Sequence, residues 1–217
     1  MADDYLFLDG EQEIDRTHGN LPHWNQGHKI YFVTFRLSDS IPLEVLHRYE
    51  QDSLYMEQVI EMNGGLPKDW QLYKVKKHNK VLRYLDNGYG ECLLRRPDVR
   101  RIVTESLRYV GGKSCQLHAY AVMPNHVHVL MEVFEGESVT QIVGNVKKFT
   151  ARRINVLLGR SGKVWQREVH DRIVRSEAHY FRSVRYIAYN PRHCEPGTYS
   201  LFLSPDQEDY YGIKSVE

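Results

Sequence analysis

Hydrophobic residues alternate with polar ones in some parts of the chain and recur at helical spacing in others, which predicts a mixture of strands and helices. The expected strands cover residues 29–37, 116–123, 126–134 and 171–174. The expected helices cover 41–62, a second segment ending near residue 87, and then 97–110, 139–158 and 176–190. A Pro-Asn bend at 124–125 separates the two central strands.

The order of these elements predicts an α+β fold. An antiparallel sheet of about four strands, with helices packed on it in the split βαβ arrangement, accounts for the order strand, helix, two strands, helix, strand, helix. We expect an N-terminal arm at 1–28, one domain at 29–195 and a C-terminal tail at 196–217. Residues 41–96 are expected to be a helical segment inserted into that domain.

The composition is that of a globular protein. The 217 residues are 41% hydrophobic and 26% charged, and no apolar run approaches the roughly 20 residues that cross a bilayer. Three widely spaced cysteines argue against a disulfide framework. We therefore expect a cytoplasmic protein with no membrane partner.

A basic stretch lies hidden in a net charge of +1. Between Asn145 and Arg175 there are nine Lys or Arg residues against two acids. Four of these bases fall within two turns of one expected helix, at Lys147, Lys148, Arg152 and Arg153. Such a cluster can contact DNA phosphates, although a solvated helix face explains the charges equally well. Phe149, in the middle of the cluster, fits the apolar stripe of the helix, and we expect it in the core.

Two histidines separated by one apolar residue form the main chemical motif. His126 and His128 fall within an alternating strand, so their side chains point to the same face of the sheet. Two imidazoles on one face beside a bend fit a divalent-metal site, and packed or hydrogen-bonded histidines are the alternative. The spacing does not name the metal.

The last helix offers a third ligand and a nucleophile. Tyr186 and Asn190 lie four residues apart, on one helical face. Tyr186 falls away from the expected apolar stripe, which includes Phe181, whereas Tyr180 falls beside it. Tyr189 also lies off the stripe and is the rival for the nucleophile.

Five motifs in this order give the chain a family resemblance. They are YFVTFRL at 31–37, MPNHVHVL at 123–130, KFTARRIN at 148–155, VWQREVHDR at 164–172 and YIAYNP at 186–191. Together they resemble the REP-associated tyrosine transposases, a group of the single-tyrosine His-hydrophobic-His (HUH) transposases with a ferredoxin-like core. The resemblance spans roughly residues 28–195.

The resemblance implies a role for each key residue. His126, His128 and Asn190 match the ligands of a Mg²⁺ or Mn²⁺ ion, and Tyr186 matches the nucleophile. The implied enzyme is a transposase-like endonuclease and strand transferase. It cuts single-stranded or hairpin DNA at palindromic repeats through a 5′-phosphotyrosine, and it acts as a monomer more readily than as a dimer. This chain departs from the pattern at His170, where an aromatic residue is common, and after residue 193, and both departures lie outside the three ligands and the nucleophile.

Two other functions stay open from the sequence. A metal-dependent nuclease that activates water would not need Tyr186 and would need a carboxylate, for which Glu132 has the right strand register. A non-catalytic module that binds hairpin DNA would keep the basic helix without needing the ligands and the tyrosine.

Overall fold

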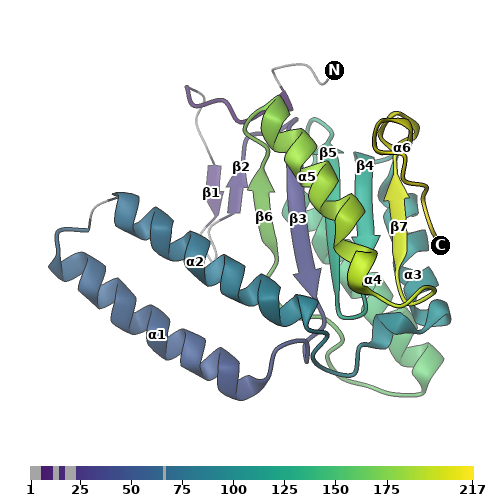
Figure 1. The fold of residues 1–217 in the computed structure, drawn as a ribbon, viewed down its shortest axis with the longest axis horizontal. Coiled ribbons are helices and arrows are strands. Elements are labelled where there is room, and N and C mark those ends of the chain that lie inside the picture. Colours follow the sequence, from purple (N-terminus) through teal and green to yellow (C-terminus); the bar gives the residue numbers. More distant parts are fainter. Residues whose placement is uncertain (1–5, 12–14, 18–22, 66) are drawn as a thin grey trace.

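A five-stranded antiparallel sheet forms the centre of the computed structural model, which describes residues 6–11, 15–17, 23–65 and 67–217 (Figure 1). The strands lie in the order β6-β3-β5-β4-β7. Their bounds are His170–Ile173 for β6, Ile30–Arg36 for β3, His126–Val133 for β5, Cys115–Val122 for β4 and Ser200–Leu203 for β7. The two central strands form the hairpin expected around the Pro-Asn bend.

Helices cover both faces of this sheet. Helices α3 (Pro97–Val110) and α4 (Val139–Leu158) pack on one face, and α5 (Glu177–Tyr189) crosses the other (Figure 1). The strand alternation separates two cores, because Val127 and Val129 join the α3–α4 core while Leu130 joins the α5 core. The expected α+β class is therefore confirmed.

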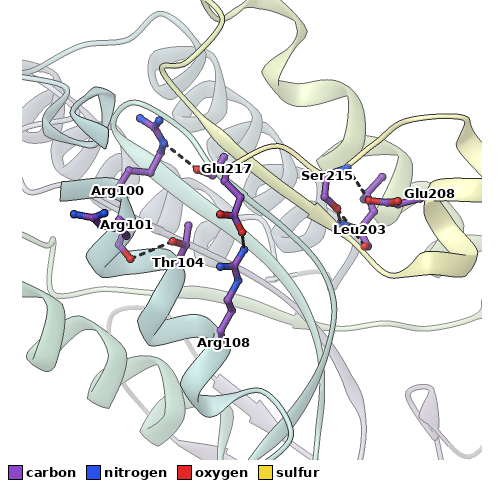
Figure 2. A network of polar contacts seen from close by, with 9 residues as sticks. Arg100, Arg101, Thr104, Arg108, Leu203, Glu208, Ser215 and Glu217 are labelled. Atoms are coloured by element: carbon purple, nitrogen blue, oxygen red, sulfur yellow. Dashed lines mark hydrogen bonds and ion pairs between the residues drawn. The ribbon is translucent and has the colours of Figure 1, made fainter. Parts of the chain in front are cut away.

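The sheet has one strand more than the sequence predicted. The segment expected as a tail supplies β7 and then helix α6 (Pro205–Tyr211). Backbone hydrogen bonds join Val216 to Leu201, so the segment after α6 runs back along the edge of β7. In Figure 2, Arg108 of α3 pairs with Glu217, and Ser215 donates its backbone N–H to Glu208. This edge strand has only four residues, Ser-Leu-Phe-Leu, which do not alternate between apolar and polar and therefore gave no strand pattern.

The N-terminal arm is partly packed on the sheet. Leu6 and Phe7 are buried in the α5 core, and the backbone N–H of Leu8 donates to the carbonyl of Val174. Strands β1 (Asp15–Thr17) and β2 (His23–Asn25) pair with each other. The rest of the expected arm, at 1–5, 12–14 and 18–22, lies outside the described residues.

The inserted segment forms two long helices, α1 (Leu43–Met62) and α2 (Pro67–Asp86), which lie side by side in Figure 1. A short 3-10 turn at Leu93–Arg95 follows and leads into α3. The far end of α2 reaches the sheet near the end of β3 (Figure 1). No helix within the described ranges is long and apolar enough to cross a membrane.

Two aromatic residues differ from their predicted positions. Phe149 on α4 is 55% exposed, and Phe181 on α5 is 37% exposed, although helical spacing placed both in apolar stripes. The core on each side of the sheet is filled by smaller residues, among them Val146 on α4 and Val184 on α5. Each helix therefore presents a narrower buried stripe than its pattern suggested.

Candidate active site

The two histidines lie together under α5. Both are buried, with side chains on the α5 face of β5, and their Nε2 atoms are 3.0 Å apart. In the register of the sheet, His126 stands opposite Arg36 and His128 opposite Thr34. The site therefore lies where β3 ends and β5 begins, beside the Pro-Asn bend.

Hydrogen bonds hold the Nδ1 atom of each ring. The amide of Asn125 donates to the carbonyl of Tyr89 (3.0 Å), which turns its Oδ1 toward His126 Nδ1 (2.8 Å). Since this oxygen can only accept, Nδ1 of His126 carries the proton, and the lone pair of its Nε2 is directed toward Nε2 of His128. Thr34 Oγ1 lies 2.8 Å from His128 Nδ1 and can hold that ring in the same tautomer.

This arrangement fits a metal ion. Ligand atoms typically lie about 2.1 Å from Mg²⁺, and histidine nitrogens lie about as far from zinc. Two ligands at right angles about one such ion would be separated by nearly the distance observed between the two Nε2 atoms. Metal-binding histidines usually donate the other ring N–H to a neighbouring group, as both rings can here. Burial lowers the pKa of His126 to about 3, so its imidazole is neutral and able to bind a cation.

Tyr186 approaches the histidine pair from α5. Its hydroxyl lies 3.5 Å from Nε2 of His128, and its ring packs edge-on against that of His128 with centroids 5.1 Å apart. Phe32 on β3 contacts both rings. Burial, and then the charge of Asp86, raise the pKa of Tyr186 well above its usual value, while a hydrogen bond from Asn190 opposes this.

The other two tyrosines of α5 have different surroundings. The hydroxyl of Tyr180 bonds to His118 Nδ1 (2.9 Å) and accepts from Gln207 (2.6 Å). Tyr189 is 41% exposed, with the guanidinium of Arg185 lying 5.9 Å from its ring centre. The geometry thus favours Tyr186 over Tyr189 as the tyrosine positioned for chemistry.

Asn190 completes the group at the end of α5. Its side chain lies near the carboxylate of Asp86 and the hydroxyl of Tyr186, where it lowers the pKa of both groups, and within the described structure its buried Oδ1 has no hydrogen-bond partner. The histidines and Asp86 do not form a cluster of three His, Cys, Asp or Glu side chains able to hold a metal among the described residues. A buried amide oxygen without a partner is the kind of group that could serve as a third ligand.

Asp86, the last residue of α2, was missed by the sequence reasoning. Burial raises the pKa of its carboxyl, and the hydrogen bond from Asn190 opposes that rise. The residue belongs to the inserted helices, far from every motif in the sequence. No pattern could have identified it, because only the packing of α2 brings it to the site.

The basic cluster of α4 lies on the opposite side of the sheet from the histidines. Lys148, Arg152 and Arg153 are exposed, while Lys147 is half-buried and donates to the carbonyl of Arg167 (2.8 Å). Burial, and then the positive charge of Arg36, lower the pKa of Lys147 to about 8. Arg36 stands opposite His126 in the sheet, so a positive charge that acts on Lys147 lies at the end of the sheet that carries the site.

The carboxylate of Glu132, on the same face of the sheet, contacts two other histidines. One carboxylate oxygen lies 2.6 Å from Nε2 of His28, and the other lies 3.4 Å from Nε2 of His118. His118 also contacts Tyr180, which ties this cluster to α5. These contacts hold the carboxylate of Glu132 in place further along β5, away from the pair formed by His126 and His128.

The segment that carries the site resembles a known protein family. Residues 94–189 match the family described as "Transposase IS200 like". This segment contains His126, His128 and Tyr186, and the resemblance to transposases inferred from the motifs is confirmed there. Asn190 lies immediately beyond it.

A solved structure of a REP-associated tyrosine transposase bound to a REP hairpin is also similar to this chain. The identity is 14%, the match covers 91% of this chain and 88% of that one, and the TM-score is 0.46. No curated protein sequence matches the chain.

Proposed function

We propose that this protein cuts and rejoins single-stranded DNA at hairpins, with Tyr186 as the nucleophile and a divalent ion held by His126, His128 and Asn190. The observation that carries the proposal is the convergence of four polar atoms in one buried place. Two imidazole Nε2 atoms are 3.0 Å apart, the Tyr186 hydroxyl is 3.5 Å from one of them, and the side chain of Asn190 lies near the same hydroxyl and lowers its pKa. The match to IS200-like transposases over 94–189 supports DNA as the substrate.

The reaction would be a transfer of a phosphodiester to tyrosine. A bond from the Tyr186 oxygen to phosphorus forms as the bond from phosphorus to the 3′ oxygen breaks. The phenol loses its proton and the departing 3′ oxygen gains one, which leaves a 5′-phosphotyrosine and a free 3′-hydroxyl. Attack by a 3′-hydroxyl on the phosphotyrosine reverses these bond changes and rejoins a strand.

The protein's own side chains would orient this step. Thr34 and Asn125 fix the imidazole rings, and the ring contacts with Phe32 and His128 fix the phenol of Tyr186. Asn190 would hold the hydroxyl while Asp86 holds Asn190. A divalent ion bound by the two histidines, as Mg²⁺ or Mn²⁺, would polarise the phosphate and favour the phenolate of a tyrosine whose pKa burial has raised.

The path of the DNA is proposed to run from α4 to the end of β3. Lys148, Arg152 and Arg153 would contact phosphates of the hairpin, and Lys147 lies between them and Arg36. Because Arg36 is paired with His126, the backbone of a strand that follows this charge would be delivered to the histidine side.

A nuclease that activates water is the second candidate, and Glu132 weighs against it. Its carboxylate is held by His28 and His118 rather than turned toward the histidine pair. A binding module without catalysis has no use for two buried imidazoles with both Nδ1 atoms held.

The deciding experiment uses a labelled hairpin with a single-stranded flank and Mn²⁺ or Mg²⁺. Wild type is expected to form a protein–DNA adduct that survives denaturation, and Tyr186→Phe is expected to bind the same DNA without forming it. Tyr189→Phe is the matched control, since it removes a hydroxyl from the same helix. Cleavage without an adduct by Tyr186→Phe would support the water-activating nuclease, and loss of the adduct in Tyr189→Phe alone would move the nucleophile.

A further inference from the structure

A pocket of about 370 Å³ lies between α5 and α6, on the outer side of the helix that carries Tyr186. Four aromatic rings and two guanidinium groups line it, from Phe181, Arg182, Arg185, Tyr189, Tyr210 and Tyr211. No acidic side chain is among its lining residues. The volume is within the range of about 300–1,000 Å³ that small-molecule sites occupy.

The aromatic rings of this pocket are accessible. Tyr210 is 71% exposed, Tyr189 41% and Phe181 37%. The rings of Phe181 and Tyr210 lie 5.6 Å apart at an interplanar angle of 31°. The hydroxyl of Tyr211 donates to the backbone carbonyl of Phe181 (3.0 Å), which fixes α6 against α5 and keeps these rings in place.

The charges around the pocket favour an anion. Arg185 lies 5.9 Å from the ring centre of Tyr189, and Arg182 faces the same space. Of the three acids of α6, Glu208 and Asp209 share an ion pair with Lys214, and none of the three lines the pocket. Planar apolar surface beside two guanidinium groups, neither of which forms an ion pair within the described residues, matches a nucleotide, because the rings can stack on a base and the arginines can bind its phosphate.

The place of the pocket on α5 connects it with the active site. Arg182 lies one helical turn before Tyr186, and Tyr189 lies three residues after it, so both are neighbours of Tyr186 on the helix surface. A strand whose phosphate reaches Tyr186 would therefore pass along this side of α5. The basic residues of α4 lie on the other side of the sheet and cannot serve this part of the strand.

We infer that the pocket between α5 and α6 binds an unpaired nucleotide of the single-stranded flank, next to the phosphate that Tyr186 attacks. The base lies among the rings of Phe181, Tyr189 and Tyr210, and its phosphate pairs with Arg182 and Arg185. This inference rests on the proposed function and adds to it a subsite for the flank, separate from the hairpin contacts on α4.

The test compares a hairpin with a single-stranded flank and the same hairpin without one, by fluorescence anisotropy. Wild type should bind the flanked hairpin more tightly, since one stacked base contributes roughly 5- to 150-fold in affinity. The double variant Tyr210→Ala, Arg182→Gln should lose most of that advantage and bind the bare hairpin as wild type does. Tyr109→Ala is the matched control, because Tyr109 is an equally exposed tyrosine (68%) on α3.

A second readout reports contact with the base. With 5-iodouracil in the flank, irradiation should cross-link the base to the ring of Tyr210 or Tyr189, located by mass spectrometry. Melting curves of the double variant show whether the fold is kept.

The outcomes separate the pocket from the proposed function. If wild type forms the Tyr186 adduct but the double variant keeps the full advantage of the flank, the pocket inference is overturned while the function stands. The same holds if the cross-links map away from α5 and α6. If wild type neither binds hairpins nor forms the adduct, both the function and the pocket inference fail.

Discussion

Replacing Thr34 by Val tests whether the histidine pair binds metal. The hydroxyl of Thr34 lies 2.8 Å from Nδ1 of the buried His128, and Val keeps the shape of the side chain while removing this partner. Losing the hydrogen bond behind a ligand histidine typically lowers metal affinity about 10- to 100-fold, which is about 1.4 to 2.7 kcal/mol. Loss of this buried hydrogen bond should also lower the stability of the metal-free protein by about 0.5–1.5 kcal/mol.

Titration calorimetry with Mn²⁺ measures the first effect, and thermal melting without metal measures the second. Thr34→Ser should restore binding, because it keeps the hydroxyl. Thr104→Val is the matched control, since Thr104 is also buried but donates to the carbonyl of Arg101 within its own helix (Figure 2). Equal Mn²⁺ affinity for wild type and Thr34→Val would refute the reasoning about His128, and a wild type that binds no divalent ion would refute the metal site.

Three further predictions concern groups around the site. Asp86→Asn should slow adduct formation about 10- to 100-fold with little change in hairpin affinity, because it removes the carboxylate next to Asn190. An unchanged rate of adduct formation would limit α2 to a packing role. Changing Lys147, Lys148, Arg152 and Arg153 together to Gln should weaken hairpin binding and flatten its dependence on salt, as measured by fluorescence anisotropy at several salt concentrations. If the affinity and its salt dependence do not change, these side chains form only a solvated surface. Lys147 is cationic below its pKa of about 8, so the hairpin affinity of wild type should fall as the pH rises from 7 to 9. The affinity of Lys147→Arg should change less over this range, because the guanidinium stays charged. Parallel pH profiles of the two proteins would exclude a phosphate contact at Lys147.

Local pattern determined most of the secondary structure. The bounds of β5 follow from alternation and from the Pro-Asn bend, and those of α3 follow from Pro97 and a glycine pair, because each signal acts on neighbouring residues. The same alternation placed His126 and His128 on one face, where their Nε2 atoms are 3.0 Å apart. Helical spacing likewise brought Tyr186 and Asn190 to one side of α5, close enough for a hydrogen bond.

The sequence pattern did not determine which residues surround the histidines, Tyr186 and Asn190. Which strand lies beside β5 decides that Thr34 holds His128, and the packing of an inserted helix decides that Asp86 holds Asn190. The strand β7 and the pocket between α5 and α6 come from a segment whose sequence suggested only a tail. Phe149 and Phe181 are exposed for the same reason, since how much of a helix is buried depends on what packs against it. The sequence thus determined which chemical groups exist and which face each occupies. Contacts between residues distant in the chain depend on the free energy of packing the whole molecule, so the tertiary structure decided which groups meet.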